Sequence, residues 1–357
     1  MMRHTQDHQA QLPLADVRFA VESTRDAWRC LRGGRLFLTG GTGFIGTWFL
    51  EAFLYANREL QLAASVEVLS RDPEALLTRR QHLRSEPALS FVAGDVRDFD
   101  VEGRQFTHLV HAATTSGGPV HPQEMFSVIV DGTRRVLDAC KKAKPVRGLF
   151  ISSGAVYGKQ PSSVSHVGED HEGGPSPVVS SSAYGEGKRA AELITTMAAE
   201  FDGVPCSIAR CFAFVGPILP LHAHFAVGNF IADVLAKRPI RVNGDGTPRR
   251  SYLYAAELVA WLITILIQGT PGRPYNVGSE HDLSIRDLAE VVAERAAIVW
   301  PEYRHAVKLA VPPSEHAIAS PSRYVPSCKR ASKELGLQQQ IGLQDAIDRT
   351  IAYYAGH

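Results

Sequence analysis

The chain has 357 residues, of which 45% are hydrophobic and 21% are charged, a composition that is average for a globular protein and excludes a disordered or fibrous chain. Its 38 Lys+Arg and 37 Asp+Glu give a net charge of +1, so no general positive field attracts nucleic acid. Five scattered cysteines without a Cys-x-x-Cys pair exclude a disulfide framework and a zinc site of that type, and they indicate a reducing, cytoplasmic setting.

The first 34 residues are polar and weakly patterned, and they lack the apolar segment that a signal peptide needs. We predict an N-terminal extension on the surface over residues 1–34, with one or two helical turns near residues 21–31. The longest apolar stretch of the chain, Leu258 to Ile267, is about half a membrane span and predicts a buried helix. No membrane association is therefore expected.

The pattern changes at Arg35, where short apolar runs begin to alternate with helical segments. In chain order the runs are LFLTG, VEVLS, FVAGD, HLVHAA, LFISS and SIARCFAF. Strands and helices at this spacing form βαβ units, so we predict an α/β fold with a doubly wound parallel sheet. After about Pro217 glycine and proline become more frequent, which indicates a smaller, irregular lobe. The predicted divisions are a dinucleotide-binding domain over 35–215 with a returning segment near 250–278, and an interleaved C-terminal substrate-binding lobe over 216–249 and 279–357.

The first predicted strand runs into a glycine-rich loop, Gly40-Gly41-Thr42-Gly43-Phe44-Ile45-Gly46, and a helix-like segment follows. The loop satisfies both GxGxxG and GxxGxxG. Such glycines allow a tight turn, close approach of the backbone to a pyrophosphate and packing of helix on strand, while the helix N-terminus supplies free N–H groups. Because a strand precedes the loop and a helix follows it, we predict dinucleotide binding rather than an ordinary turn. The expected cofactor contacts are Gly40, Gly43, Phe44, Ile45 and Gly46.

Several further segments occur in a characteristic order: TGGTGFIG, GDVRD at 94–98, HAA at 111–113, SSGAVYG at 152–158 and YGEGK at 184–188. RCFAFVGP, GDGTPRRSYLY, YNVGSEHDLSIRDLAEVVAE and CKRASKELGL continue the series. Over about residues 35–355 the chain resembles the extended short-chain dehydrogenase/reductases, the NAD-dependent epimerase/dehydratase family that acts on nucleotide sugars. The resemblance implies a Rossmann domain in which Asp95 and Val96 hold the adenine and Ala112, Ala113 and Thr114 line the cofactor.

The second predicted strand ends in Ser70-Arg71-Asp72, and this end decides the choice of cofactor. A fold that prefers NAD usually has a carboxylate here for the ribose 2′-OH, whereas a nearby arginine accommodates a 2′-phosphate. Ser70 replaces the acid and Arg71 is placed to bind the phosphate, so we predict NADP(H). Two alternatives stay open: Arg71 is a solvated loop residue that stacks on the adenine, or Asp72 reaches the ribose and the cofactor is NAD.

Tyr184 and Lys188 are four residues apart on a predicted helix, so both project from one face. A free tyrosine has a pKa of about 10, and we expect Lys188 and a cationic nicotinamide to bring the pKa of Tyr184 toward the working range. The resemblance implies that Ser153, at the end of the fifth strand, hydrogen-bonds the substrate oxygen. It also implies that Lys188 holds the nicotinamide ribose. Ser153, Tyr184 and Lys188 are the predicted catalytic residues.

Residues that depart from the family pattern narrow the range of reactions expected of this chain. Dehydratases of this family carry Asp-Glu before the VYG segment and the sugar-acid decarboxylases carry Ser-Glu, but this chain has Gly154-Ala155, which cannot transfer a proton. Usual dehydratase and decarboxylase mechanisms are therefore disfavoured. Ile129, Ala213 and Val215 replace an Asn, an Asn and a Tyr of the family pattern, which predicts a reshaped, more apolar sugar pocket, as a deoxysugar would require.

The resemblance also indicates residues that hold a nucleotide sugar. Asn229 matches a segment that contacts the nucleotide diphosphate, and Arg250 matches an arginine that grips a phosphate; the alternative for Arg250 is a structural salt bridge. Arg323 is a weaker candidate for a second phosphate contact. We add Thr115, His222 and His224 as substrate contacts. His222 and His224 would share a face of a strand, but without a third ligand they predict no metal site.

These observations together predict an NADPH-dependent reductase of a nucleoside-diphosphate 4-keto-6-deoxysugar, with Tyr184 as the proton donor. One alternative is a nucleotide-sugar 4-epimerase, or a decarboxylase-like enzyme, with tightly bound NAD. A second alternative is a catalytically silent dinucleotide-binding protein. We further expect a cytoplasmic homodimer that binds neither nucleic acid nor a membrane.

Overall fold

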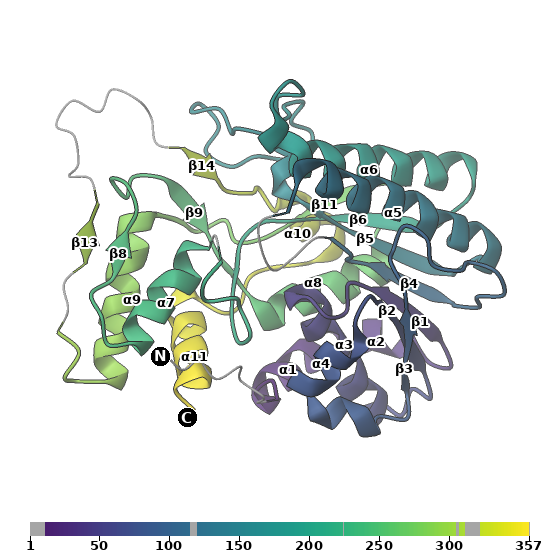
Figure 1. Cartoon of the computed structure of the whole chain (residues 1–357), viewed down its shortest axis with the longest axis horizontal. Helices are drawn as coiled ribbons and strands as arrows, with labels where there is room; N and C mark the ends of the chain where they lie inside the picture. Colours follow the sequence, from purple (N-terminus) through teal and green to yellow (C-terminus); the bar gives the residue numbers. More distant parts are fainter. Residues whose placement is uncertain (1–10, 115–119, 224, 305–306, 311–321, 357) are drawn as a thin grey trace.

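A computed structural model describes residues 11–114, 120–223, 225–304, 307–310 and 322–356. Its centre is a parallel sheet of seven strands in the order β3-β2-β1-β4-β5-β6-β11 (Figure 1). The order reverses between β1 and β4, which is the switch point at which doubly wound sheets bind their ligands. The doubly wound parallel fold is therefore confirmed. The strands are β1 (Arg35–Thr39), β2 (Ser65–Ser70), β3 (Leu89–Ala93), β4 (His108–His111), β5 (Arg147–Ser153), β6 (Cys206–Cys211) and β11 (Pro274–Val277).

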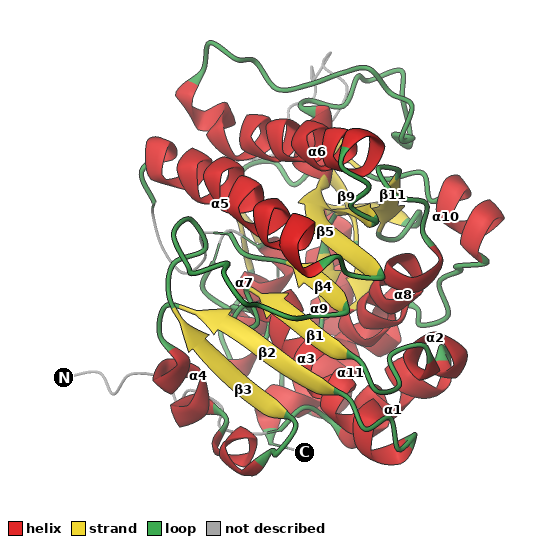
Figure 2. Cartoon of the chain, turned by 90° about the vertical axis from the view of Figure 1, so that its right-hand side faces the viewer, coloured by secondary structure: helices red, strands yellow, loops and turns green. Residues whose placement is uncertain are grey.

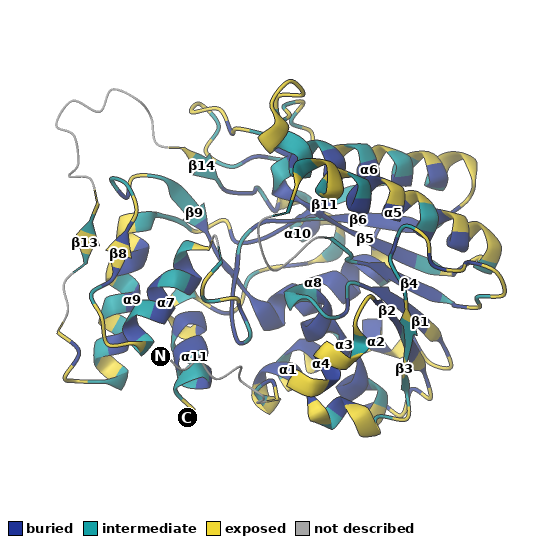
Figure 3. Ribbon diagram, viewed as in Figure 1, coloured by how far each residue is buried: buried dark blue, intermediate teal, exposed yellow. Residues whose placement is uncertain are grey.

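Helices cover both faces of this sheet, with α5 and α6 on one face and α3 and α8 on the other (Figure 2). Alternation along β1 explains the arrangement, because Leu36 and Leu38 join the core beneath α3 and α8 while Phe37 joins the core beneath α5. Figure 3 shows the strands buried between these layers. The helices are α3 (Phe44–Glu59), α4 (Pro73–Arg79), α5 (Pro122–Ala143), α6 (Ala183–Phe201) and α8 (Ala255–Gln268), with short 3₁₀ turns at η1 (Gln81–Ser85), η2 (Gly154–Tyr157) and η3 (Ser180–Ser182).

The described part of the N-terminal segment is not a surface extension. It forms α1 (Leu14–Glu22) and α2 (Arg25–Arg29), and both pack against α8. Val21 and Trp28 are fully buried, and Asp16 accepts hydrogen bonds from the Tyr254 hydroxyl (2.5 Å) and the Arg349 guanidinium (2.7 Å). The prediction was wrong because a narrow apolar stripe suffices to dock a helix, even where most residues are polar.

The C-terminal lobe surrounds a three-stranded sheet in which β9 (Arg249–Ser251) lies between β12 (Asp282–Ser284) and β14 (Arg323–Tyr324). Ser284 caps the following helix, since its side chain accepts from the Asp287 N–H while the Asp287 carboxylate accepts from the Ser284 N–H. The exact domain boundaries stay a prediction. The remaining elements are β7 (Phe214–Val215) paired with β10 (Leu253–Tyr254), β8 (Arg241–Val242) paired with β13 (Lys308–Leu309), and the helices α7 (Ala226–Leu235), α9 (Ile285–Val299), α10 (Lys329–Leu335) and α11 (Leu343–Ala355).

The apolar stretch that the sequence predicts to be buried forms most of α8, and Leu258 to Ile265 lie in the core. Across the residues that the structure describes, no helix combines the length and apolar character needed to cross a membrane.

Candidate active site

The glycine loop leaves the carboxyl end of β1 and turns directly into α3. Gly40 has a φ of +73°, and a Cβ there would lie 2.5 Å from the backbone carbonyl of Ala112, at the end of β4. A Cβ at Gly46 would lie 2.2 Å from the Gly40 carbonyl oxygen. These two glycines are therefore required by the backbone turn and by the packing of α3 on the loop.

Gly43 differs from its neighbours, because a Cβ there would meet only the Gly40 carbonyl oxygen at an ordinary 3.5 Å. Its φ of −83° and ψ of 177° suit any residue. No contact with the described residues explains this glycine, whereas a pyrophosphate approaching the start of α3 would. The cradle at Gly43 therefore fits a dinucleotide.

The end of β4 provides a second observation of the same kind. Ala112, Ala113 and Thr114 continue from β4 beside the glycine loop, and the Ala113 N–H donates to the Thr39 hydroxyl (3.2 Å). The Thr114 hydroxyl is buried and has no hydrogen-bond partner among the described residues. A buried polar atom without a partner is costly, so a ligand group that pairs with it is expected.

A buried histidine links neighbouring elements at this edge of the sheet through hydrogen bonds. The ring nitrogens of His111 contact the hydroxyls of Thr39 (2.7 Å) and Thr133 (3.1 Å), and the Thr133 hydroxyl donates to the Ile129 carbonyl (2.6 Å). Burial, assisted by the Lys188 charge, lowers the pKa of His111 to about 3. The ring is therefore neutral, and it holds β1, β4 and α5 together where Ile129 replaces the family's asparagine.

At the end of β2, where the sequence analysis places the adenosine part of the cofactor, some polar groups already have partners. The Ser70 hydroxyl accepts from the Asp72 N–H (3.2 Å), and the Asp72 carboxylate caps α4 by accepting from the Ala75 N–H (3.0 Å). Arg71 is exposed. A capping carboxylate is less available to a ribose, which weakens the alternative in which Asp72 selects NAD.

Asp95 and Val96 lie on the loop after β3. The Asp95 carboxylate accepts two hydrogen bonds from the Arg97 guanidinium (2.8 and 2.9 Å), and these bonds hold its pKa below the usual value. Val96 is buried against α5, where a Cβ at Gly132 would lie 2.7 Å from its side chain. Arg97, which the sequence analysis did not single out, therefore holds the Asp95 carboxylate in place.

The three predicted catalytic residues lie together at the carboxyl end of β5. Ser153 ends β5, and its hydroxyl accepts from the Ala155 N–H (3.1 Å) at the start of η2, which fixes its rotamer. Tyr184 and Lys188 project from the first turns of α6, and Ser153 lies near enough to Tyr184 to lower the pKa of its hydroxyl. The sequence prediction that these side chains come from β5 and α6 agrees with this geometry, while their catalytic roles stay a prediction.

The electrostatics of the tyrosine differ from the expectation. Burial raises the pKa of Tyr184, and this effect outweighs the lowering by the nearby Ser153 side chain. The Lys188 ammonium instead donates to the Ile151 carbonyl (2.7 Å) and lies 4.9 Å from the centre of the Phe150 ring. Burial lowers the pKa of Lys188 to about 8. In the protein by itself, therefore, Tyr184 is a protonated phenol.

The Gly154-Ala155 departure has a structural cause. A Cβ at Gly154 would lie 2.7 Å from the Phe212 ring and 2.8 Å from the Tyr324 hydroxyl. Phe212 follows β6 and Tyr324 belongs to β14, so both rings reach this point from distant parts of the chain. A side chain at position 154 would therefore require the Phe212 and Tyr324 side chains to shift, and Tyr324 is a residue of this region that the sequence analysis missed.

Arg250 lies opposite Tyr324 in the β9–β14 pairing, with its guanidinium carbon 5.9 Å from the centre of the Tyr324 ring. Its guanidinium donates to the carbonyls of Arg249 (2.8 Å) and Ser322 (3.4 Å). Within the described residues it forms no ion pair, so the salt-bridge alternative finds no support there. Arg323, in contrast, pairs with Asp282 (2.8 Å), which competes with a role as a phosphate contact.

The other predicted substrate residues are less informative. Asn229 is partly buried on α7, beside Phe230 and Ile231, which are core residues. His222 is exposed on a turn rather than on a strand, so the shared strand face considered for it does not apply. Thr115 and His224 lie outside the described residues. Among the residues that are described, no group of three or more metal-binding side chains occurs.

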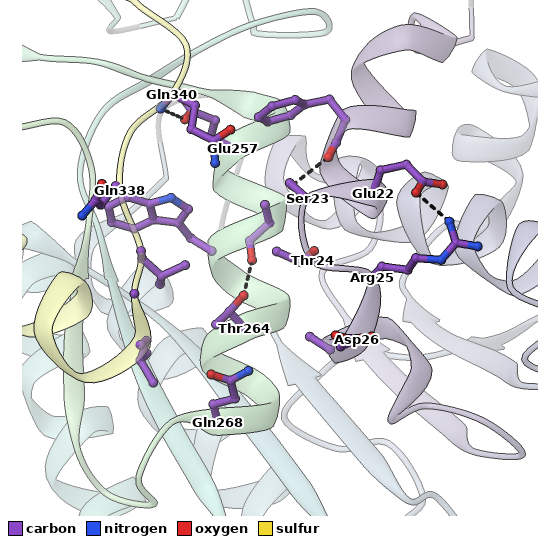
Figure 4. Close-up of a pocket in the computed structure, with 17 residues that line it drawn as sticks. Glu22, Ser23, Thr24, Arg25, Asp26, Glu257, Thr264, Gln268, Gln338 and Gln340 are labelled. Atoms are coloured by element: carbon purple, nitrogen blue, oxygen red, sulfur yellow. Dashed lines mark hydrogen bonds and ion pairs between the residues drawn. The ribbon is translucent and has the colours of Figure 1, made fainter.

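A cavity of about 340 Å³ lies elsewhere, between the N-terminal helices, α8 and the segment after α10 (Figure 4). None of the described candidate site residues lines it. Glu257 accepts a hydrogen bond from the Gln340 N–H with one carboxylate oxygen, while the other has no partner among the described residues. Burial raises the pKa of Glu257 to about 7.

A switch-point glycine loop beside a Ser-Tyr-Lys group defines a dinucleotide-dependent enzyme of the short-chain dehydrogenase/reductase class. Residues 36–278 match the model of the NAD dependent epimerase/dehydratase family, and the chain belongs to this family. Its relatives include enzymes that act on nucleotide sugars, as the resemblance implied.

Among these relatives, UDP-glucuronic acid decarboxylase 1 of Arabidopsis thaliana is 28% identical over 320 residues, which cover 89% of this chain and 69% of the relative. The dTDP-glucose 4,6-dehydratase of Streptomyces antibioticus is 25% identical over 332 residues, covering 89% and 92%. Among solved structures, the UDP-glucuronic acid 4-epimerase of Bacillus cereus in complex with NAD has a TM-score of 0.73 at 22% identity, covering 90% of this chain and 98% of its own. The latter comparison supports the fold alone.

Proposed function

We propose that this protein is an NADPH-dependent reductase of a nucleoside-diphosphate 4-keto-6-deoxysugar. The observation that carries the proposal is the filled space at Gly154, where a Cβ would lie 2.7 Å from the Phe212 ring and 2.8 Å from the Tyr324 hydroxyl. An elimination or decarboxylation of the usual kind needs an acid or hydroxyl at positions 154 and 155. Simple hydride transfer needs only one proton donor, which Tyr184 provides.

The side chains around β5 fit this chemistry. A phenol whose pKa is raised by burial is protonated at neutral pH, which suits a proton donor in a reduction. Ser153 orients the carbonyl oxygen toward Tyr184, and the Lys188 ammonium near them favours the negative charge that forms as Tyr184 gives up its proton. A bound nicotinamide supplies the hydride for such a reaction.

The preference for NADPH is supported by the end of β2. Ser70 supplies no carboxylate to the ribose, Asp72 is engaged in capping α4, and Arg71 is exposed and unconstrained enough to meet a 2′-phosphate. The dinucleotide itself is supported by the open cradle at Gly43 and by the buried Thr114 hydroxyl.

A nucleotide-sugar 4-epimerase with tightly bound NAD is the second candidate. Solved structures of similar fold include a UDP-glucuronic acid 4-epimerase in complex with NAD, and an epimerase also requires hydride transfer without elimination. Because an epimerase retains its dinucleotide through turnover, the absorbance of the purified protein separates the two candidates. Protein purified without dinucleotide that oxidises NADPH with a keto-deoxysugar supports the reductase; retained NAD with interconversion of 4-epimers contradicts it.

The proposed homodimer has a candidate interface on the outer face of α5 and α6 (Figure 2). Leu193, Met197 and Phe201 follow each other at helical spacing on α6 and are exposed, and Phe126 on α5 is exposed as well. A stripe of this kind is typical of a surface that another chain covers. Sedimentation that gives a monomer at micromolar concentration would contradict the dimer.

A further inference from the structure

Tyr324 places a hydroxyl in the reacting part of the site, although it lies 171 residues from Ser153 in the sequence. The two oxygens are 3.4 Å apart. Ser153 lowers the pKa of Tyr184 and Tyr184 raises the pKa of Tyr324, so the Tyr184 hydroxyl lies near both. Three hydroxyls therefore converge at the carboxyl end of β5, where the sequence analysis placed two.

The Tyr324 hydroxyl retains the capacity to donate to a ligand. Hydrogen bonds between two hydroxyl groups usually span about 2.7–2.8 Å, so a contact of 3.4 Å leaves this donor weakly used. Burial raises the pKa of Tyr324, and the phenol therefore stays protonated at neutral pH. A neutral O–H donor suits an uncharged sugar oxygen.

The position of this hydroxyl is fixed on several sides. The Tyr324 ring packs on Phe212, with 4.7 Å between the ring centres, and the Arg250 guanidinium lies over it. Both neighbours of Tyr324 in the chain are held, since the Arg323 side chain pairs with Asp282 (2.8 Å) and the Val325 N–H donates to the Gln160 side chain (3.0 Å). Tyr324 thus connects the candidate phosphate residue, Arg250, with the candidate reacting end, Ser153.

We propose that Tyr324 contacts the substrate and donates a hydrogen bond to the sugar oxygen at the reacting carbon, beside Ser153. It occupies the space that a side chain at Gly154 would need, so it defines that side of the sugar pocket. A neutral donor at this point favours an uncharged, keto or hydroxyl sugar carbon over a sugar acid. The assignment of the reacting carbon rests on the proposed function.

The test is the Tyr324→Phe variant, which keeps the ring on Phe212 and Arg250 but removes the hydroxyl. A matched control is Tyr303→Phe, because Tyr303 is a buried tyrosine of the same lobe whose hydroxyl donates to the Arg238 carbonyl (2.8 Å), away from Ser153. Calorimetry on the dinucleotide-loaded protein compares two probes, a nucleoside diphosphate and its hexose conjugate. Four pairs of nucleoside diphosphate and hexose conjugate are compared first, those of dTDP, UDP, GDP and CDP. The pair that raises the melting temperature of the wild type most is then used.

We expect Tyr324→Phe to bind the nucleoside diphosphate within twofold of the wild type but the hexose conjugate about tenfold more weakly. NADPH oxidation with a keto-sugar should slow by at least the same factor, while Tyr303→Phe leaves both affinities and the rate unchanged. A merely structural role would lower the melting temperature or weaken both probes equally, and either that result or no change in either probe overturns the proposal.

The same design separates this proposal from the proposed function. Suppose that the wild type turns over no keto-sugar with NADPH. A Tyr324→Phe variant that loses the tighter binding of the hexose conjugate still supports the contact. In that case the contact stands and the reductase is refuted. If the wild type and Tyr324→Phe reduce a keto-sugar at the same rate and bind both probes with equal affinity, the contact is refuted but the reductase is not.

Discussion

The two sides of the candidate active site are built in different ways. One side comes from β5 and α6, where Ser153, Tyr184 and Lys188 lie within a short stretch of sequence and each is positioned by its own element. The other side comes from the short strands β9 and β14, which carry Arg250 and Tyr324 and depend on pairing between distant segments. In the proposed function, the first side contains the groups that transfer a proton, and the second determines which sugar fits beside them.

This division explains why a family of one fold can host several reactions. The β5–α6 side needs only a strand end and one helix face, so its geometry depends little on the rest of the chain. The β9–β14 side also shapes the space at Gly154, because the Tyr324 hydroxyl would lie 2.8 Å from a Cβ there. Changes on the two sides should therefore have separable effects.

The largest expected effect is on the proton-transferring side. Tyr184→Phe keeps the ring but removes the proton donor, so kcat should fall by about 10²–10⁴-fold while the dinucleotide still binds. Steady-state rates with a keto-sugar, together with dinucleotide titration, measure both quantities. A variant that turns over at nearly the wild-type rate would show that the proton comes from another group, and the division between the two sides would fail.

Substitutions at two glycines of the cofactor loop test separately the effect of packing and the effect of ligand contact. Gly46→Ala places a Cβ 2.2 Å from the Gly40 carbonyl oxygen, so we expect a loss of about 1–3 kcal/mol in the free energy of unfolding. Gly43→Ala meets only a 3.5 Å contact, so its stability should match the wild type while its dinucleotide affinity falls. Chemical denaturation and dinucleotide titration of both variants test this pair. Equal stability losses would mean that Gly43 also serves the fold.

The sequence predicted those parts of the molecule whose geometry is local. The glycine loop, the strand ends and the Tyr184–Lys188 spacing follow from short segments, and the structure places them as expected. The packing of Trp28 and the convergence of Tyr324 on Ser153 were missed because each depends on contacts with distant segments. The raised pKa of Tyr184 was also missed, since it results from burial that no local pattern reveals.

A smaller effect is expected at the adenine end, which lies apart from both sides. Arg71→Asp replaces a phosphate partner with a carboxylate, so the preference should shift from NADPH toward NADH by about tenfold or more. Arg79→Asp, at the exposed end of α4, is the control with the same change in charge. The ratio of kcat/KM for the two cofactors is the measurement. A wild type that already prefers NADH by tenfold, or about 1.4 kcal/mol, would refute the argument from Ser70 and Arg71.

The smallest effect is expected at Glu257, which is remote from both sides of the candidate active site. A substitution there should change the stability of the protein without changing the reaction. Its pKa is about 7 in the folded protein and about 4.5 for an ordinary glutamate, so the folded state binds more protons between these values. The free energy of unfolding therefore falls as the pH rises from about 4.5 to 7. Because glutamine carries no charge to desolvate, Glu257→Gln should be more stable than the wild type at pH 8, by on the order of 1 kcal/mol.

That gain should shrink as the pH is lowered to 5, where Glu257 is protonated in the folded protein. The matched control is Glu22→Gln, because Glu22 borders the same cavity but is exposed and pairs with Arg25 (2.6 Å). Its stability should differ from that of the wild type by a similar small amount at both pH values. Melting temperatures at pH 5 and pH 8, with kcat as the second readout, test the prediction. A gain that persists at pH 5, or a change in kcat, would show that Glu257 acts through something other than its buried charge.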